Sequence, residues 1–187
     1  PMEWTPLEAI KTNILGFHHV LHYSKVYPIE KFIFISTDKA VNPHSIMGGT
    51  KWLGERMTRN SGKGYIAVRF GNVLGSRGSV IPIWQKQHNQ NRTITVTSAE
   101  ARRYFMTIEE AVDLVIQAAK IGQGGETIVL DMGSPMSILE LAKEIVQKTR
   151  GKIAITGLRQ GEQEIERLML EVEEKIAIKK GRFFIIP

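Results

Sequence analysis

The chain has 187 residues, 42% of them hydrophobic and 24% charged, which is the composition of a folded globular domain. It contains no cysteine, and this excludes disulfides, thiolate zinc sites and cysteine nucleophiles. The net charge of +6 permits an anionic partner. Lysine and arginine are nevertheless spread along the whole chain rather than clustered with aromatic residues, so we expect no nucleic-acid binding.

Neither a metal site nor a membrane span is expected. His18 and His22 are four residues apart, but no third ligand lies near them in the sequence. No apolar run approaches the roughly 18 to 20 residues that a spanning helix needs, and the first residues lack the regions of a signal peptide. We therefore expect a cytoplasmic domain, an expectation that leaves room for a membrane anchor elsewhere in a longer protein.

The first predicted element is a helix over residues 6–25. Thr5 is a candidate N-cap, Pro6 suits the first helical position, and Glu8 stands at the capping-box position. Apolar residues then recur at the spacing of one helical face. These are Leu7, Ile10, Ile14, Phe17 and Leu21.

Two apolar runs then read as buried parallel strands, KFIFIS (31–36) and YIAVRF (65–70). Residues 45–60 between them are predicted to be helical, which gives a strand–helix–strand unit with a crossover long enough for parallel pairing. This order predicts an α/β fold.

The rest of the chain continues the alternation. Glu109 and Glu110 favour the start of one helix, and Ser137 is a candidate N-cap of another, with Glu140 at its box position. The predicted helices cover 80–91, 108–121 and 137–149, and the predicted strands cover 93–97, 126–133 and 152–156. The tail from Glu171 is charged and then apolar, and its packing is not assigned.

A dinucleotide-binding fold normally has a Gly-rich turn after its first strand, and no G-x-G-x-x-G occurs here. The first predicted element is also a helix rather than a strand. The chain therefore reads as the second part of a doubly wound fold.

The polar loop after strand 31–36 is the candidate reactive site, because open α/β sheets bind ligands beyond the carboxyl ends of their strands. Thr37 offers a hydroxyl, Asp38 a carboxyl and Lys39 an amine. Met47 and Lys51 lie four residues apart, on one face of the next helix. A turn in which Thr37 and Asp38 only satisfy the backbone, with solvated lysines, is the structural alternative, and the residues alone leave it open.

Several longer segments carry a family resemblance. They are ISTDKAVNP with IMGGTK, VRFGNVLGSRGSVIP, RRYFMTIEEAVDLV, VLDMGSPMSILELA and TGLRQGEQEIERL. Together they are similar, in order and over nearly the whole chain, to UDP-N-acetylglucosamine 4,6-dehydratases of the CapD type. These are extended short-chain dehydrogenase/reductases of polysaccharide biosynthesis.

The resemblance implies a catalytic set at the loop and helix. Thr37 would hold the 4-hydroxyl of the sugar, Asp38 would protonate the departing C6 hydroxyl, and Lys39 would remove the C5 proton. Lys51 would bind the ribose of NADP or NAD. Met47 stands where most of the family has tyrosine, a change that some members share and that leaves open which group deprotonates O4.

The resemblance also implies nucleotide-sugar contacts further along the chain. Asn72 would meet the sugar nucleotide, with Gly71 and Gly75 allowing close backbone approach. Three further roles follow: Ser79 and Val80 beside the uridine, Arg103 and Arg159 at the diphosphate, and Glu162 at the ribose hydroxyls. We expect Arg77 and Arg102 to be surface charges.

The implied fold is the C-terminal part of a Rossmann-like extended short-chain dehydrogenase/reductase, a parallel sheet with a small substrate-binding α/β region. Residues 1–75 would hold the second part of the Rossmann-like domain, and 76–187 mainly the nucleotide-sugar-binding region, interleaved with the sheet. A homo-oligomer formed through helices 6–25 and 45–60 is implied as well. Because the Gly-rich half is not in this chain, three hypotheses stand: a fragment of a longer dehydratase, half of a split enzyme, or a binding or structural module without catalysis.

Overall fold

The computed structural model describes residues 2–27, 29–76, 79–91, 93–149 and 151–187. The chain divides into two compact units. Unit 1 comprises Pro1–Phe70, Val112–Asp131 and Arg167–Pro187, and unit 2 comprises Gly71–Ala111 and Met132–Glu166. Each unit is therefore assembled from segments far apart in the sequence. The functional division expected at residue 75 stays a prediction.

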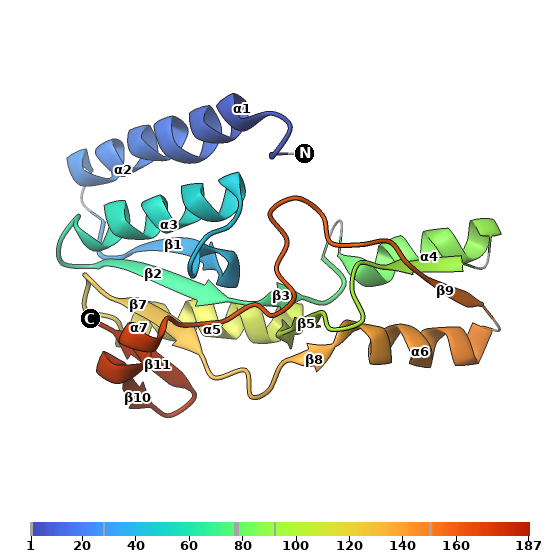
Figure 1. Ribbon diagram of the computed structural model, residues 1–187. Helices are drawn as coiled ribbons and strands as arrows, with labels where there is room; N and C mark the ends of the chain where they lie inside the picture. Colours follow the sequence, from blue (N-terminus) through green and yellow to red (C-terminus); the bar gives the residue numbers. More distant parts are fainter. Residues whose placement is uncertain (1, 28, 77–78, 92, 150) are drawn as a thin grey trace. The chain divides into compact units, whose positions relative to one another are not determined.

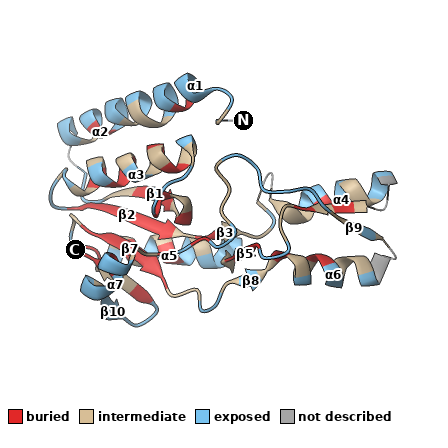
Figure 2. Ribbon diagram, viewed as in Figure 1, coloured by how far each residue is buried: buried red, intermediate tan, exposed pale blue. Residues whose placement is uncertain are grey.

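Unit 1 is built on a five-stranded sheet with the order β1-β2-β7-β11-β10 (Figure 1). The strands are β1 (Phe32–Thr37), β2 (Tyr65–Phe70), β7 (Thr127–Leu130), β11 (Phe183–Ile186) and β10 (Ile178–Lys180). The first three run parallel, and β11 and β10 are antiparallel to their neighbours. All four residues of β7 and the first five of β2 are buried (Figure 2), as the apolar runs predict for central strands.

Helix α3 (Ile46–Arg59) packs on β1 and β2, and the first helix packs on α3. Gly54 permits a close approach of α3 to the sheet, since a Cβ there would lie 2.3 Å from the Phe34 ring. Phe34 in turn packs against Phe17, with ring centroids 4.6 Å apart. The predicted helix 45–60 and both predicted strands are thus confirmed.

The predicted helix 6–25 forms as three consecutive parts: α1 (Pro6–Ile10), the π-helical turn η1 (Lys11–Gly16) and α2 (Phe17–Val26). The apolar residues of the predicted helical face are not buried together, because Leu7 is 69% exposed while Leu21 is buried, and Ala9 is buried near the start. A π-helical turn rotates the residues before it relative to a continuous 3.6-residue period, which explains the shift. Thr5 is the N-cap residue and Pro6 the first helical residue, as predicted, but Thr5 makes no side-chain capping bond.

The tail completes the sheet of unit 1. Helix α7 (Glu171–Ile176) is followed by the β10–β11 hairpin, whose turn contains Gly181 at φ +60°. Strand β11 pairs with β7. The apolar end of the tail is therefore sheet, and Phe183 and Ile186 are buried.

Unit 2 contains α4 (Val80–Asn91), α6 (Ile138–Thr149) and the parallel pair β4 (Thr93–Val96) and β9 (Lys152–Ile155). Its core gathers around Trp84, whose Nε1 donates to the carbonyl of Thr95 at 2.7 Å. The other buried members of this core are Ile94, Val96, Ala101, Ile138 and Ala142.

Four two-residue strands were not predicted: β3 (Asn72–Val73), β5 (Arg102–Arg103), β6 (Phe105–Met106) and β8 (Met136–Ser137). Two residues are too few to show the alternating pattern of apolar and polar side chains by which a strand is predicted. The remaining predicted elements are confirmed, including α5 (Ile108–Ile121), which Thr107 and Glu110 begin with reciprocal capping bonds of 3.1 and 2.8 Å. Within the described ranges, no helix is both long and apolar enough to cross a membrane.

Candidate active site

Three of the predicted residues form one hydrogen-bonded group where β1 ends. Thr37 is the last residue of β1, and Asp38 and Lys39 begin the 3-10 turn η2 (Asp38–Ala40). Thr37 Oγ1 donates to Asp38 Oδ1 at 2.8 Å, and Lys39 Nζ donates to the same oxygen at 3.0 Å. One carboxylate oxygen therefore holds both a hydroxyl and an amine.

The burial of this group is uneven. The Asp38 side chain is 0% exposed, whereas that of Lys39 is 31% exposed. Asp38 Oδ2 is buried and has no hydrogen-bond partner among the described residues. The two donors on Oδ1 therefore come from Thr37 and Lys39, and Oδ2 is the oxygen of this carboxyl that they leave unused.

Helix α3 brings Met47 and Lys51 into unit 1, where the η2 group also lies. Lys51 Nζ donates to the carbonyl of Ile35 on β1 at 3.0 Å and lies 4.9 Å from the centroid of the Phe34 ring. Burial lowers the pKa of Lys51, and the nearby Glu55 carboxylate opposes that shift. Met47 is half-buried. Its thioether can neither donate nor take a hydroxyl proton.

Three contacts hold the start of α3 in place. Gly48 lies so close to the loop that a Cβ there would be 2.3 Å from the carbonyl oxygen of Lys39. At the helix start, Ser45 Oγ accepts from the Gly48 N–H at 3.0 Å. The carboxylate of Glu3 accepts from the Ile46 N–H at 2.8 Å, where a negative charge at a helix N-terminus is favourable. The helix that carries Lys51 and the turn that carries Lys39 are thus in direct backbone contact.

Unit 2 holds the predicted nucleotide-sugar residues. Asn72 lies in β3, which pairs with β6, and its N–H donates to the carbonyl of Tyr104 at 2.8 Å. Gly71 permits this approach, since a Cβ there would lie 2.7 Å from that of Tyr104. Gly75 has φ +74° in the turn that follows. These glycines have a structural reason to be present whether or not a ligand binds.

The predicted uridine contacts stand at the start of α4. Ser79 Oγ is buried without a hydrogen-bond partner among the described residues. Val80 packs against the Trp84 core. Of the two expected surface arginines, Arg102 is exposed and Arg77 lies outside the described residues.

Arg103, Glu162 and Arg159 are linked to one another within unit 2. Arg103 is buried, and its Nη2 donates to Glu162 Oε1 at 3.0 Å. The other carboxylate oxygen, Oε2, accepts from the backbone N–H of Arg159 at 3.1 Å, while the Arg159 side chain is exposed. Only one of the two predicted diphosphate arginines therefore presents its side chain to solvent.

Two parts of the site were missed by the sequence analysis. Glu3 lies 43 residues before the helix that it caps, so no local pattern could have found it. Thr97 is the last residue of the predicted strand 93–97, and its hydroxyl donates to Glu162 Oε1 at 2.8 Å. The position of Thr97 at the carboxyl end of a strand was a usable signal, and it was not used.

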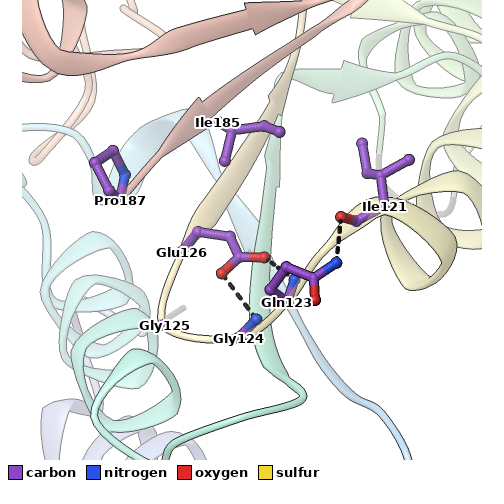
Figure 3. A pocket seen from close by; sticks show the side chains of 7 residues that line it. All are labelled: Ile121, Gln123, Gly124, Gly125, Glu126, Ile185 and Pro187. Carbon is purple, nitrogen blue, oxygen red and sulfur yellow. Dashed lines mark hydrogen bonds between the residues drawn. The ribbon is translucent and has the colours of Figure 1, made fainter.

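A hollow of about 270 Å³ in unit 1 lies elsewhere (Figure 3). It is lined by Ile121, Gln123, Gly124, Gly125, Glu126, Ile185 and Pro187. Most of these residues precede β7 and therefore lie at the amino end of a strand parallel to β1. Thr37 and Asp38 lie at the carboxyl end, so this hollow is separate from the candidate active site.

Several known proteins are similar to this chain in sequence. The chain is 48% identical over 178 residues to the capsular polysaccharide biosynthesis protein CapD of Staphylococcus aureus, covering 90% of this chain and 30% of CapD. It is 37% identical over 195 residues to a UDP-glucose 4-epimerase of Rickettsia bellii, covering 99% of this chain and 57% of that protein. The chain thus spans about one third to somewhat over half of these relatives.

The solved structure of Pen from Bacillus thuringiensis matches with a TM-score of 0.94 and 36% identity, covering 100% of this chain and 61% of Pen. The structural matches confirm the predicted fold class, that of the Rossmann-like extended short-chain dehydrogenase/reductases. A family model described as "Polysaccharide biosynthesis protein" matches residues 1–187. The chain belongs to this polysaccharide biosynthesis family.

Proposed function

We propose that the chain contributes the catalytic loop and the nucleotide-sugar-binding region of a 4,6-dehydratase that acts on UDP-N-acetylglucosamine, with NADP or NAD, in polysaccharide biosynthesis. The family and the likeness to a UDP-glucose 4-epimerase support a nucleotide-sugar substrate. The observation that carries the proposal is the Thr37–Asp38–Lys39 group, in which an acid and a base share one oxygen at the end of β1.

The reaction needs an acid and a base close together. Once C4 of the sugar is a ketone, the C5 proton is acidic, and its removal must accompany loss of the C6 hydroxyl. The Asp38 carboxylate would become the acid by accepting the O4 proton through Thr37, and the partly exposed Lys39 would release its own proton to solvent and act as a neutral amine.

In the elimination, the Lys39 amine takes the C5 proton and the C5–C6 double bond forms. The C6 hydroxyl leaves as water with the proton of Asp38. Lys39 is then an ammonium and Asp38 a carboxylate. When C6 receives the hydride, the Lys39 ammonium would return a proton to C5 and become a neutral amine again. Because Asp38 is fully buried, Thr37, whose hydroxyl donates to Asp38, is the described group through which its proton would reach the substrate.

A nicotinamide cofactor, when bound, would accept the hydride from C4 and return it at C6. Lys51 fits such a group, because it is a half-buried amine with one donor used on Ile35 and further N–H bonds available for ribose hydroxyls. Met47 supplies no proton acceptor at the tyrosine position. Deprotonation of O4 is therefore assigned to Asp38, acting through Thr37.

On the substrate side, Arg159 is proposed at the diphosphate and Glu162 at the ribose hydroxyls. Asn72, Ser79 and Val80 are proposed beside the sugar and uridine, and Arg103 in the diphosphate region. Pairing of two copies through helices 6–25 and 45–60 stays a prediction.

Binding of the substrate to this chain tests the proposal first. Isothermal titration with UDP-N-acetylglucosamine should give saturable binding that UDP competes for, and Arg159→Ala should weaken it. The matched control is Arg102→Ala, an exposed arginine expected to leave binding unchanged. Absence of any binding by UDP or UDP-N-acetylglucosamine would remove the substrate from the proposal.

A further inference from the structure

The turn that carries Arg159 is closed by its own backbone and by one side chain. The Glu162 N–H donates to the Arg159 carbonyl at 3.0 Å, which makes residues 159–162 a β-turn. Gly161, at the third position, has φ +77°, a conformation that side-chain-bearing residues rarely adopt. The Arg159 N–H donates back to Glu162 Oε2 at 3.1 Å. The carboxylate of Glu162 therefore closes the turn.

Two donors fix the other oxygen of that carboxylate. Thr97 Oγ1 and Arg103 Nη2 both donate to Glu162 Oε1, at 2.8 and 3.0 Å. A carboxylate held by three donors on two oxygens has a defined orientation and still has acceptor capacity on Oε2. Glu162 can thus position the turn and accept from a ligand hydroxyl at the same time.

Each nitrogen of the Arg103 guanidinium contacts another group of unit 2. Its Nη1 donates to the carbonyls of Arg102 and Glu164 at 2.9 and 2.8 Å, and its Nε lies 3.3 Å from Glu166 Oε1. The side chain is only 8% exposed. Turning this group towards a ligand would break several charge-assisted bonds, each stronger than a neutral one. Arg103 is therefore placed to act on Glu162 rather than directly on an anion.

We propose that Thr97 and Arg103 are positioning residues. They orient the Glu162 carboxylate, which closes the 159–162 turn and so presents the exposed guanidinium of Arg159 to the diphosphate of a nucleotide. The nucleotide as ligand rests on the proposed function. The closing of the turn rests only on the contacts within unit 2.

The test uses the whole chain and three variants. Thr97→Val keeps the shape of the side chain and removes the donor, and Thr97→Ser restores the donor. Ser98→Ala is the matched control, because Ser98 Oγ donates at 3.0 Å to the exposed carboxylate of Glu164 and not to Glu162. Each protein is measured for amide hydrogen exchange at Arg159 by NMR and for affinity towards UDP and pyrophosphate by calorimetry.

One hydrogen bond is worth about 0.5 to 1.5 kcal/mol, so Thr97→Val should speed exchange at the Arg159 amide and weaken UDP binding about three- to tenfold. Thr97→Ser should restore both values, and Ser98→Ala should change neither. Unchanged exchange in Thr97→Val, or equal effects of Thr97→Val and Ser98→Ala, would overturn the positioning role. If the unmodified chain binds no UDP, the proposed function and the ligand named here fail, while the exchange comparison still decides how the turn is held.

Discussion

Arg69 and Glu55 form a two-bond ion pair in the interior of unit 1. Arg69 Nε donates to Glu55 Oε1 at 2.9 Å and Nη2 to Oε2 at 2.6 Å, with both side chains at most 3% exposed. The same guanidinium donates to Glu173 at 2.8 and 3.1 Å. Because Glu55 lies on α3, Arg69 on β2 and Glu173 on α7, this triad ties the helix of Lys51 to the C-terminal segment.

Replacing Arg69 should destabilise the protein strongly. Arg69→Met leaves two buried carboxylates without their cation, and removing one partner of a buried ion pair costs about 3 to 5 kcal/mol. The control is Arg167→Met, which removes an exposed partner of Glu171 and should change stability by under about 0.5 kcal/mol. Urea unfolding followed by circular dichroism gives both values. Equal losses in the two variants would contradict the role of the triad.

The triad also predicts how stability changes with pH. Burial works against the charge of Glu173, but the bonds from Arg69 and the Leu170 N–H outweigh it and lower the pKa of Glu173. A carboxyl with a lowered folded pKa stabilises the protein above its unfolded value of about 4.3, and this contribution is lost as the pH falls below it. Unfolding free energy measured from pH 6 downwards should therefore decrease. Glu173→Gln should be less stable at pH 6 and should lose less on acidification.

Two adjacent glycines of α3 offer a matched pair of substitutions. Gly48→Ala would place a Cβ 2.3 Å from the Lys39 carbonyl and should cost about 1 to 3 kcal/mol, while displacing the η2 turn. Nothing lies within 4 Å of a Cβ at Gly49, so Gly49→Ala should stabilise the helix by about 0.5 to 1 kcal/mol. Thermal unfolding of both variants checks the opposite signs. If both substitutions changed the stability in the same direction, the close contact between α3 and the loop would be contradicted.

Lys51 should lose its proton at a lower pH than an ordinary lysine. Its pKa is lowered by burial, against the opposing effect of Glu55. NMR titration of the protein after ¹³C reductive methylation should place the Lys51 signal below the ordinary value of about 10.4. Lys51→Arg identifies the signal by its disappearance. A Lys51 signal that titrates at or above the ordinary value would contradict the buried position of the amine.

The elements with strong local patterns could be predicted from the sequence. Apolar runs such as YIAVRF predicted the central strands, and the order of strand, helix and strand indicated the α/β class. The β10–β11 hairpin could not be predicted, because β11 is stabilised by pairing with β7, a partner about 50 residues earlier in the chain, and β10 pairs only with β11. The π-helical turn at Lys11–Gly16 interrupts a period that otherwise looked continuous.

The candidate site shows the same limit. Asp38 and Lys39 could be found because they are adjacent and follow a strand. The bonds of Glu162 to Thr97 and Arg103 join residues separated by 65 and 59 positions, so only the folded chain reveals that both residues donate to Glu162. Burial was also beyond the sequence analysis, since nothing in the tripeptide distinguishes a fully buried Asp38 from a partly exposed Lys39.

Lys39 and Asp38 are proposed to remove water across C5 and C6 of a UDP-sugar. The most direct measurement is incubation of the protein, in the longest form in which it is encoded, with UDP-N-acetylglucosamine and NADP in deuterated water. The predicted result is a 4-keto-6-deoxy product with solvent deuterium at C5. In Lys39→Met the rate of its formation should fall about 10²- to 10⁴-fold. A C4 epimer that keeps its original C5 hydrogen would contradict the dehydratase and favour an epimerase.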